Sequence, residues 1–295
     1  MSAAQINITL ILPLVLSFTA ELIVSLGRVQ EFLAFGSIGR RYRRSLSLSN
    51  DTAVEIREVS ASWTGDPNFL ALKNISLRIR RGKLCAIIGA VGSGKSSILQ
   101  LLLKELPAAT GSVSVFGDIS YACQEAWLFP STVRENILFG VPYDPEKYKR
   151  VCRACALEKD FKQFPYGDQT LVGERGVSLS GGQRARINLA RAVYREADIY
   201  LLDDPLSAVD ANVGRQLFDG CINEYLRGRT RILVTHQIHF LKAADFIIVL
   251  NEGGVENMGT FDELVSAGKE FAQLLNSIQE GKEKDTASIG SGVSM

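Results

Sequence analysis

A glycine-rich segment, Gly89-Ala-Val-Gly-Ser-Gly-Lys-Ser96, constrains the fold of this chain more than any other feature. It has the form G-x-x-x-x-G-K-[ST], follows the apolar run LCAIIG and precedes the helical pattern SSILQLLLKEL. In such a strand–turn–helix context, glycines let backbone N–H groups curl around phosphate oxygens, and the helix N-terminus adds a partial positive charge. Lys95 can reach the β- and γ-phosphates, and the Ser96 hydroxyl can bind Mg²⁺. The segment therefore predicts a site for nucleotide phosphates rather than a chance glycine-rich turn.

The apolar pattern predicts an α/β fold around this segment. Short β-branched runs come first (AVEIREVS, SLRI and LCAIIG), and strand-like and helical runs alternate later (IYLLDD, NVGRQLFDGCINEYL, RILVTH and FIIVL). Apolar strands that alternate with helices are typical of a mainly parallel sheet covered on both faces. The leading strands indicate an added antiparallel layer. The helical stretch from Thr132 to about Phe164 interrupts the alternation and indicates an inserted helical subdomain.

The charge balance and the cysteines exclude several classes of protein. The chain has 33 Lys and Arg against 32 Asp and Glu, a net charge of +1, so we expect no nucleic-acid partner held by bulk charge. The hydrophobic share of 46% and the charged share of 22% are those of a globular chain. Five loosely spaced cysteines do not make a disulfide scaffold and suit a reducing cytosol.

A second candidate site lies at the end of the apolar strand IYLLDD, where Asp203 and Asp204 stand side by side. A carboxylate at a strand end beside a phosphate-binding loop can hold Mg²⁺ through water, which we assign to Asp203. The next carboxylate, Asp204, can orient or deprotonate an attacking water. The alternative is that the two acids only cap the next helix or turn, but a preceding hydrophobic strand and a phosphate loop in the same chain favour the metal site.

Between these two motifs lies Leu179-Ser-Gly-Gly-Gln183, and here the chain resembles the nucleotide-binding domain of ATP-binding cassette (ABC) transporters, whose signature is LSGGQ. The resemblance covers about Ala53 to Ile278. Other family elements follow in the expected order: Trp63 resembles the aromatic residue that stacks on adenine, Gln124 the Q-loop glutamine, LVGERG the exporter loop that touches coupling helices, Ser207 and Asp210 the D-loop, and His236 the switch histidine. The segments GAVGSGKSS, STVRENILFG, LSGGQRARINLARAVY and YLLDDPLSAVD are similar to the first cassettes of subfamily C, the multidrug-resistance-protein-like exporters.

The resemblance implies a set of sites for ATP and Mg²⁺. It assigns ATP binding to Trp63, Gly89, Val91, Gly92, Ser93, Gly94, Lys95, Ser96 and Ser97. It assigns Mg²⁺ to Ser96, Gln124 and Asp203, and catalysis to Asp204, His236 and Gln124. Residues Leu179, Ser180, Gly181, Gly182 and Gln183 would face the γ-phosphate of a second, head-to-tail cassette, with Ser207 and Asp210 in the D-loop. The alternative for the signature is a simple Ser180 N-cap.

The expected function is an ATP-binding and hydrolysing module that drives export together with transmembrane domains. Asp204 departs from the wider family pattern, in which a Glu follows the first Asp, although subfamily C first cassettes also resemble this chain in having Asp there. Asp is one methylene shorter, so its carboxylate lies about 1 Å farther from the water, which can cost about a hundredfold in rate. We therefore expect slow hydrolysis at this site. The alternative function is a regulatory ATP-binding module that gates a channel or partner with little hydrolysis.

The ends of the chain have a different character from the cassette, which we place at residues 53–278. An apolar run from Ile6 to Ala20 is too short for a full span and lacks the flanks of a signal peptide. The resemblance makes residues 1–35 the end of the last transmembrane helix and its cytosolic extension, with an amphipathic helix as the alternative. Residues 36–52 would be a basic linker on the cytoplasmic side of a membrane, and residues 279–295 a disordered tail.

Two further patterns predict no metal or redox site. His236 and His239 form H-x-x-H, but no Glu or third ligand completes a zinc helix, and His239 is expected on the surface. Cys152 and Cys155 form C-x-x-C without a second pair.

Overall fold

The computed structural model describes residues 3–35, 51–66, 68–173 and 177–266, and within the first range the side chains of residues 12–30. Residues 1–48 and 49–295 form two separate units. Four parts of the expected organisation lie outside the described residues: nearly all of the basic linker (36–52), the end of the cassette (267–278), the tail (279–295), and positions 174–176 of LVGERG.

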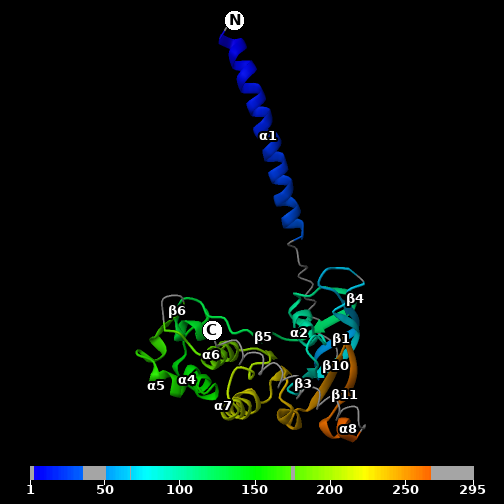
Figure 1. The fold of residues 1–295 in the computed structure, drawn as a ribbon, viewed down its shortest axis with the longest axis vertical. Helices are drawn as coiled ribbons and strands as arrows, with labels where there is room; N and C mark the ends of the chain where they lie inside the picture. Colours follow the sequence, from blue (N-terminus) through cyan, green and yellow to red (C-terminus); the bar gives the residue numbers. More distant parts are fainter. Residues whose placement is uncertain (1–2, 36–50, 67, 174–176, 267–295) are drawn as a thin grey trace, which may run out of the picture. The chain divides into compact units, whose positions relative to one another are not determined.

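The first unit contains one long helix, α1 (Ala3–Phe35, 33 residues; Figure 1). The Thr19 hydroxyl donates to the carbonyl oxygens of Val15 and Leu16, both at 2.9 Å, so this polar group is satisfied within its own helix. The segment Leu12–Gln30 has 19 residues and a mean hydropathy of 1.6, and by length and composition it can cross a membrane. It reaches further along the chain than the apolar run seen in the sequence, because the helix continues past the first acidic residue.

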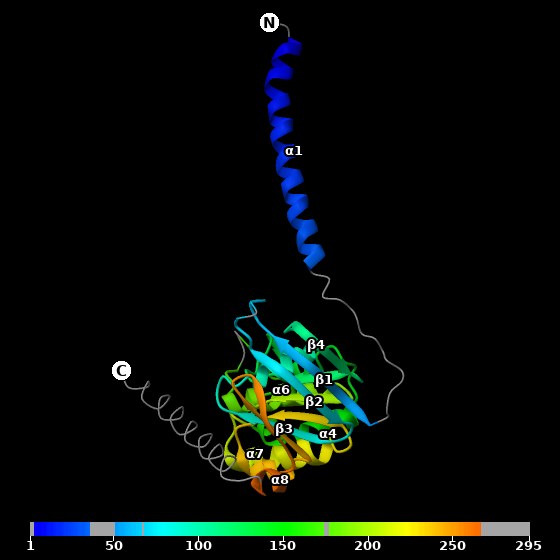
Figure 2. The ribbon, with the colours of Figure 1, turned by 90° about the vertical axis from the view of Figure 1, so that its right-hand side faces the viewer.

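The core of the second unit is a six-stranded sheet (Figure 2). Its strands lie in the order β11 (Gly254–Gly259), β10 (Phe246–Asn251), β3 (Leu84–Gly89), β9 (Thr230–Val234), β8 (Ile199–Asp203) and β5 (Ile119–Ala122). All neighbours pair in parallel except β10 and β11, which pair antiparallel at the edge. Every residue of β3, β8 and β9 is buried, which explains their continuous apolar runs in the sequence.

A three-stranded antiparallel sheet forms a second layer, with β1 (Thr52–Ala61) between β2 (Leu72–Arg80) and β4 (Ala108–Val115). Strand β2 alternates buried and exposed residues along much of its length, as expected for a sheet with one face on the core. Its buried face shares one hydrophobic cluster with the core strands and with α2 (Lys95–Leu103), through residues such as Ile98 and Leu99. The helix that follows the phosphate loop is thus enclosed by both sheets.

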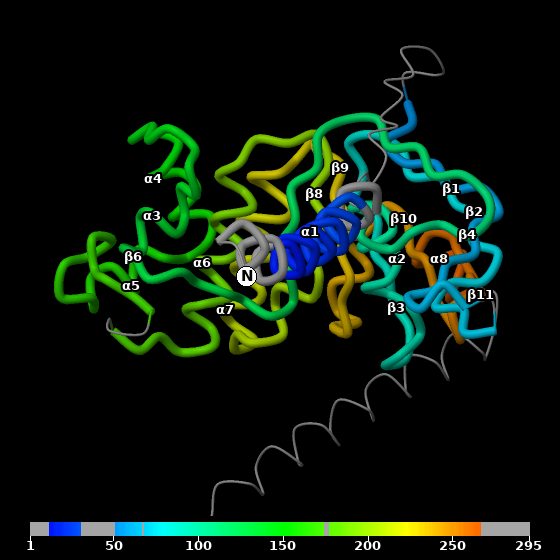
Figure 3. Tube along the Cα trace, turned by 90° about the horizontal axis from the view of Figure 1, so that it is seen from above, coloured from blue at the N-terminus to red at the C-terminus, as the bar shows by residue number. Residues whose placement is uncertain are grey.

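The helical subdomain predicted near residues 132–164 is present at the opposite end of the unit from the antiparallel sheet (Figure 3). It contains the small sheet of β6 (Ser131–Thr132) and β7 (Leu171–Val172), the helices α3 (Val133–Leu138), α4 (Pro145–Ala154) and α5 (Glu158–Gln163), and the 3-10 turn η1 (Gly167–Gln169). These elements pack on α6 (Gly181–Tyr194). The expected α/β class, with a mainly parallel sheet, an antiparallel layer and an inserted helical part, is confirmed.

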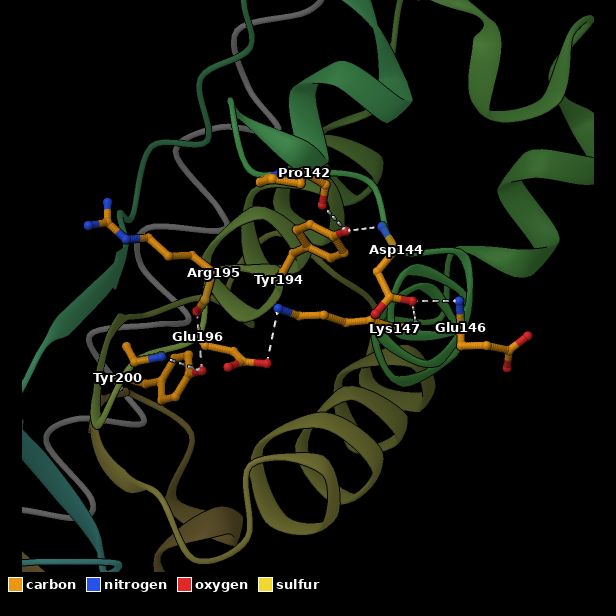
Figure 4. Close-up of polar contacts among 9 residues, drawn as sticks. Pro142, Asp144, Glu146, Lys147, Tyr194, Arg195, Glu196 and Tyr200 are labelled. Atoms are coloured by element: carbon orange, nitrogen blue, oxygen red, sulfur yellow. Dashed lines mark hydrogen bonds and ion pairs between the residues drawn. The ribbon is translucent and has the colours of Figure 1, made fainter.

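Polar contacts fasten α4 to the far end of α6 (Figure 4). The Tyr194 hydroxyl accepts from the Asp144 backbone N–H and donates to the Pro142 carbonyl oxygen, both at 2.8 Å. The Lys147 ammonium lies 3.2 Å from a Glu196 carboxylate oxygen and 4.8 Å from the centre of the Tyr194 ring. The Asp144 carboxylate caps α4 by accepting from two backbone N–H groups. The helical subdomain and α6 therefore share a hydrogen-bonded joint.

The segment NVGRQLFDGCINEYL, which the sequence predicts to be helical, is helical and has two parts. Helix α7 (Ala211–Leu217) continues directly into a π-helical stretch, η2 (Phe218–Tyr225). The buried Arg231 of β9 donates from Nη1 to the Ile222 carbonyl oxygen at 3.0 Å, so a side chain from outside the π-helical stretch binds one of its backbone carbonyl groups. The 3-10 helix η3 (Ile238–Ala243) and helix α8 (Phe261–Ser266) complete the described elements.

Candidate nucleotide-binding site

The phosphate loop joins β3 to α2, and its glycines are required by its close contacts. Gly89 has φ +154°, and a Cβ there would overlap the carbonyl oxygen of Leu250 in the neighbouring strand β10. Gly94 has φ +96°, and a Cβ would lie 3.0 Å from the carbonyl oxygen of Ala71. Gly94 is also the N-cap of α2 and offers no side-chain cap, so the first N–H groups of this helix face the loop without a side-chain acceptor. This arrangement suits an anion.

The Lys95 side chain forms hydrogen bonds with the backbone of the phosphate loop. Its Nζ donates to the carbonyl oxygens of Gly89 (3.0 Å) and Ala90 (2.7 Å). Burial lowers the pKa of Lys95, while the nearby carboxylates of Asp204 and Asp203 oppose that shift. The ammonium group is therefore poorly solvated and lies close to two acidic groups, and a bound phosphate could replace its carbonyl partners.

Asp203 ends β8 and forms a polar cluster with the phosphate loop. Its Oδ1 accepts from the Ser96 hydroxyl at 3.1 Å, and its Oδ2 accepts from the Tyr121 hydroxyl at 3.3 Å. The Tyr121 oxygen in turn accepts from Gln100 Nε2 at 3.3 Å. Burial raises the pKa of Asp203, and the hydrogen bonds from Ser96 and Tyr121 oppose the increase. Sequence reasoning missed Tyr121 and Gln100, since only the pairing of β5 with β8 brings Tyr121 to the carboxylate.

One cavity of about 420 Å³ brings most of the predicted site residues together. Its walls contain Trp63, Val91, Gly92, Gly94, Lys95, Ser96, Ser97, Gln124, Asp203, Asp204 and His236, and they also include Ala71 and Val234, which the sequence did not indicate. Gly89 and Ser93 are buried and do not line the cavity. The cavity therefore unites residues from six segments of the chain that are far apart in the sequence.

Asp204 and its neighbours lie in a constrained turn at the cavity. Asp204 has φ +43°, a conformation that Asp tolerates better than most residues. Its backbone N–H donates to the Val234 carbonyl oxygen at 3.0 Å, and its own carbonyl accepts from the Ser207 hydroxyl at 2.8 Å. Ser207 is thus fixed to the turn, while Asp210 caps α7 by accepting from two backbone N–H groups.

The signature residues Leu179–Gln183 do not line this cavity. Ser180 is the N-cap of α6, and its hydroxyl accepts from the Gln183 backbone N–H at 3.2 Å. The Gln183 Oε1 accepts from the Ser180 backbone N–H at 3.0 Å, which completes a capping box. A Cβ at Gly182 would lie 3.2 Å from the carbonyl oxygen of Ala208, so the signature helix begins directly against the D-loop. Ser180 is therefore an N-cap in this structure, which is the alternative given above for the signature.

The H-x-x-H and C-x-x-C patterns of the sequence pack against neighbouring aromatic and cysteine side chains. The His239 ring lies 4.0 Å from the ring of Phe240. The Cys155 sulfur lies 3.8 Å from the Cys221 sulfur, and both side chains are buried. Cys152 is buried nearby, and burial raises its pKa to about 12. In the part of the chain that the structure describes, no cluster of three or more His, Cys, Asp or Glu side chains is arranged to hold a metal ion.

The parallel sheet, the phosphate loop and the strand-end carboxylate together define a P-loop nucleoside-triphosphatase fold. Residues 72–207 match the family model described as "ABC transporter". The chain is 45% identical over 285 residues to mouse ATP-binding cassette sub-family C member 4, and 45% identical over 282 residues to its human counterpart. It is also 43% identical over 286 residues to the multidrug resistance protein mrp-7 of Caenorhabditis elegans. The chain belongs to the ABC transporter family, and the names of the mouse and human relatives place them in its sub-family C.

The matches cover nearly all of this chain but a small share of its relatives. They span 97% of the chain and 21% of the mouse protein, 96% and 21% for the human protein, and 94% and 19% for the nematode protein. The chain therefore spans about a fifth of the length of these relatives, over the part that contains a nucleotide-binding domain.

Proposed function

We propose that this chain is an ATP-binding and hydrolysing module that drives export across a membrane. The observation that carries the proposal is the cavity in which Lys95 and Ser96 of the phosphate loop face Asp203, Asp204 and His236. Trp63, which lines the cavity and is 55% exposed, is the residue that would stack on the adenine ring. The relatives named above are ABC and multidrug resistance proteins, which agrees with a transport role.

The residues at the base of the cavity suit a magnesium–nucleotide complex. Mg²⁺ usually takes one or two protein ligands together with phosphate oxygens and waters, so the Ser96 hydroxyl and the Asp203 carboxylate, 3.1 Å apart, suffice as the protein's share. Gln124, an exposed residue that lines the same cavity, could add an amide oxygen. When bound, the ion would neutralise phosphate charge. Lys95 would bind the β- and γ-phosphates, Asp204 would hold or deprotonate the attacking water, and His236 would contact the γ-phosphate.

The proposed working unit is a head-to-tail pair of cassettes. The signature residues lie outside the cavity and expose Ser180 and Gly181 at the start of α6. The first-turn N–H groups of this 14-residue helix could therefore face the γ-phosphate held by a second nucleotide-binding domain. Transmembrane domains are the other proposed partners, with helix α1 at the membrane and the cassette on the cytoplasmic side.

A second candidate function is a regulatory ATP-binding module with little hydrolysis. The observation that favours it is Asp204, whose side chain is one methylene shorter than that of the Glu in the wider family pattern. Slow turnover at this site agrees with both functions, because in either case the module binds ATP and its signature serves the opposite site. ATP turnover of the assembled protein, with and without transported compounds, distinguishes them.

The first test concerns ATP binding and uses two lysines that flank β3. Lys95→Ala should weaken MgATP binding about 100-fold, because the charged hydrogen bonds to phosphate that it removes are worth about 3 kcal/mol. Lys83→Ala is the matched control, since Lys83 pairs with Asp245 (3.0 Å) and does not line the cavity. Isothermal titration of the full chain with MgATP measures both. Equal affinities for the two variants, with folding intact, would contradict the proposed nucleotide site.

A further inference from the structure

A buried carboxylate outside every motif contacts the signature. Asp160 lies on α5 and is 5% exposed. Its two oxygens accept from Arg186 of α6, Oδ2 from Nε at 3.0 Å and Oδ1 from Nη2 at 2.8 Å. Oδ1 also accepts from Gln183 Nε2 at 3.2 Å. The carboxylate thus joins α5 to the first two turns of the signature helix.

This contact determines which way the Gln183 amide points. An ionised carboxylate can only accept hydrogen bonds, so it selects the amide nitrogen of Gln183 and excludes the amide oxygen. The oxygen must then face the Ser180 backbone N–H, where it accepts at 3.0 Å. A reversed amide would place two acceptors together at Asp160 and two donors together at Ser180. The charge of Asp160 therefore selects the amide orientation on which half of the capping box depends.

The capping box in turn defines the surface that Ser180 and the signature glycines present. The Ser180 hydroxyl accepts from the Gln183 backbone N–H (3.2 Å), so both polar groups of Ser180 are held by the same residue. Ser180 and Gly181 are exposed, while Asp160 is buried in its ion pair with Arg186. A surface that is ordered before its partner arrives avoids the cost of ordering on association.

We infer that Asp160 is a positioning residue that holds the signature turn, through Gln183, in the conformation that receives a nucleotide across the two-cassette interface. This inference rests on the proposed function for the trans role of the signature. It assigns Asp160 no contact with the nucleotide. Because the cavity of the chain's own phosphate loop contains none of these residues, Asp160 should influence association without changing ATP binding to the same chain.

The chain offers a closely matched control for this residue. Asp168, also in the helical subdomain, accepts from Arg134 Nε at 2.8 Å and from Nη2 at 3.1 Å, a second Arg–Asp pair with the same two-point geometry. Among the described residues, Asp168 makes its ion pair with Arg134 and no hydrogen bond with the signature helix. Asp160→Asn and Asp168→Asn therefore each remove one charge from an ion pair of this kind. Only the first places next to the Gln183 amide a group that can donate as well as accept, and that no longer selects one orientation of this amide.

The first measurement is amide hydrogen exchange of the full chain in detergent micelles. Asp160→Asn should speed exchange of the Ser180 and Gln183 amides about tenfold relative to Asp168→Asn, because the capping box loses its fixed amide. Gln183→Ala, which keeps the Asp160–Arg186 pair, should give the same increase and serves if Asp160→Asn does not fold. Equal exchange at these amides in Asp160→Asn and Asp168→Asn, or an unchanged Gln183→Ala, would overturn the inference.

The second measurement separates positioning from general destabilisation. Analytical ultracentrifugation with MgATP should show self-association weakened about tenfold by Asp160→Asn and unchanged by Asp168→Asn, while MgATP affinity of the monomer stays the same in all three proteins. Association of Asp160→Asn equal to wild type, or no ATP-dependent association of a wild-type chain that binds MgATP, would overturn the trans role of Asp160. A wild-type chain that binds no MgATP would instead refute the proposed function, and the exchange data would still decide whether Asp160 holds the turn.

Discussion

Tyr121 shows how one residue can affect a site without belonging to any of its motifs. Its hydroxyl holds the second oxygen of Asp203, whose first oxygen faces Ser96. Outer hydrogen bonds of this kind orient the carboxylates that bind metals. Tyr121 also lines a second cavity together with Trp127 and Phe139. It therefore connects this second cavity to Asp203 of the candidate nucleotide-binding site. A change in this second cavity could therefore affect Asp203, the proposed metal ligand, through one side chain.

Removal of the Tyr121 hydroxyl should weaken Mg²⁺ binding more than ATP binding. We expect Tyr121→Phe to raise the Mg²⁺ concentration needed for half-maximal nucleotide binding about tenfold, because Asp203 loses an orienting hydrogen bond. Tyr200→Phe is the control: this buried residue of β8 bonds to Ala197 and Arg195 instead (Figure 4). Fluorescent-nucleotide titrations at several Mg²⁺ concentrations and in EDTA measure both. The same Mg²⁺ dependence in Tyr121→Phe and wild type would contradict a role in metal binding.

At the scale of elements, the sequence predicted those helices, strands and turns that are determined by residues close together in the chain. The strand, loop and helix around Gly89–Ser96 follow from residues adjacent in the chain, and so does the capping of α6 by Ser180. The π-helical stretch after α7 was not predicted, because the spacing of apolar residues does not distinguish it from an α-helix. Tyr121 and Asp160 were missed because their partners come from strands or helices more than 20 residues away.

Helix α1 makes a prediction that depends on depth in a membrane. If Leu12–Gln30 spans the hydrocarbon core, Leu22→Arg near its centre should cost about 3 kcal/mol of insertion free energy. Val29→Arg near its end should cost much less, because the long side chain can reach the interface. Liposome flotation and alkaline extraction of the full chain measure retention in the bilayer. Equal losses for the two variants would indicate a helix lying on the surface instead.

At the scale of the whole molecule, the proposed function divides the functional residues that the structure describes into two half-sites. The first half-site is the cavity, which is lined by residues of the phosphate loop and by Asp203, Asp204 and His236. The second is the signature at the start of α6, whose exposed first residues lie outside that cavity. Under the proposed function, each half-site needs a surface that a second cassette would provide. ATP hydrolysis should therefore depend on association with a second cassette. The cavity of this chain should affect hydrolysis of the ATP that it binds, and the signature should affect hydrolysis of the ATP bound by the other cassette.

Asp204 allows the strength of the chain's own half-site to be tested within such a pair. Asp204→Glu should raise steady-state ATP turnover of the associated chain by at least about tenfold, because the longer side chain moves the carboxylate about 1 Å toward the water. The turn at Asp204 has φ +43°, which Asp tolerates better than Glu, so a small loss of thermal stability should accompany the gain. Asp204→Asn, which removes the base, should lower turnover. ATPase rates measured over a range of chain concentrations distinguish these effects from changes in association, and a rate for Asp204→Glu at or below wild type would show that side-chain length does not limit hydrolysis here.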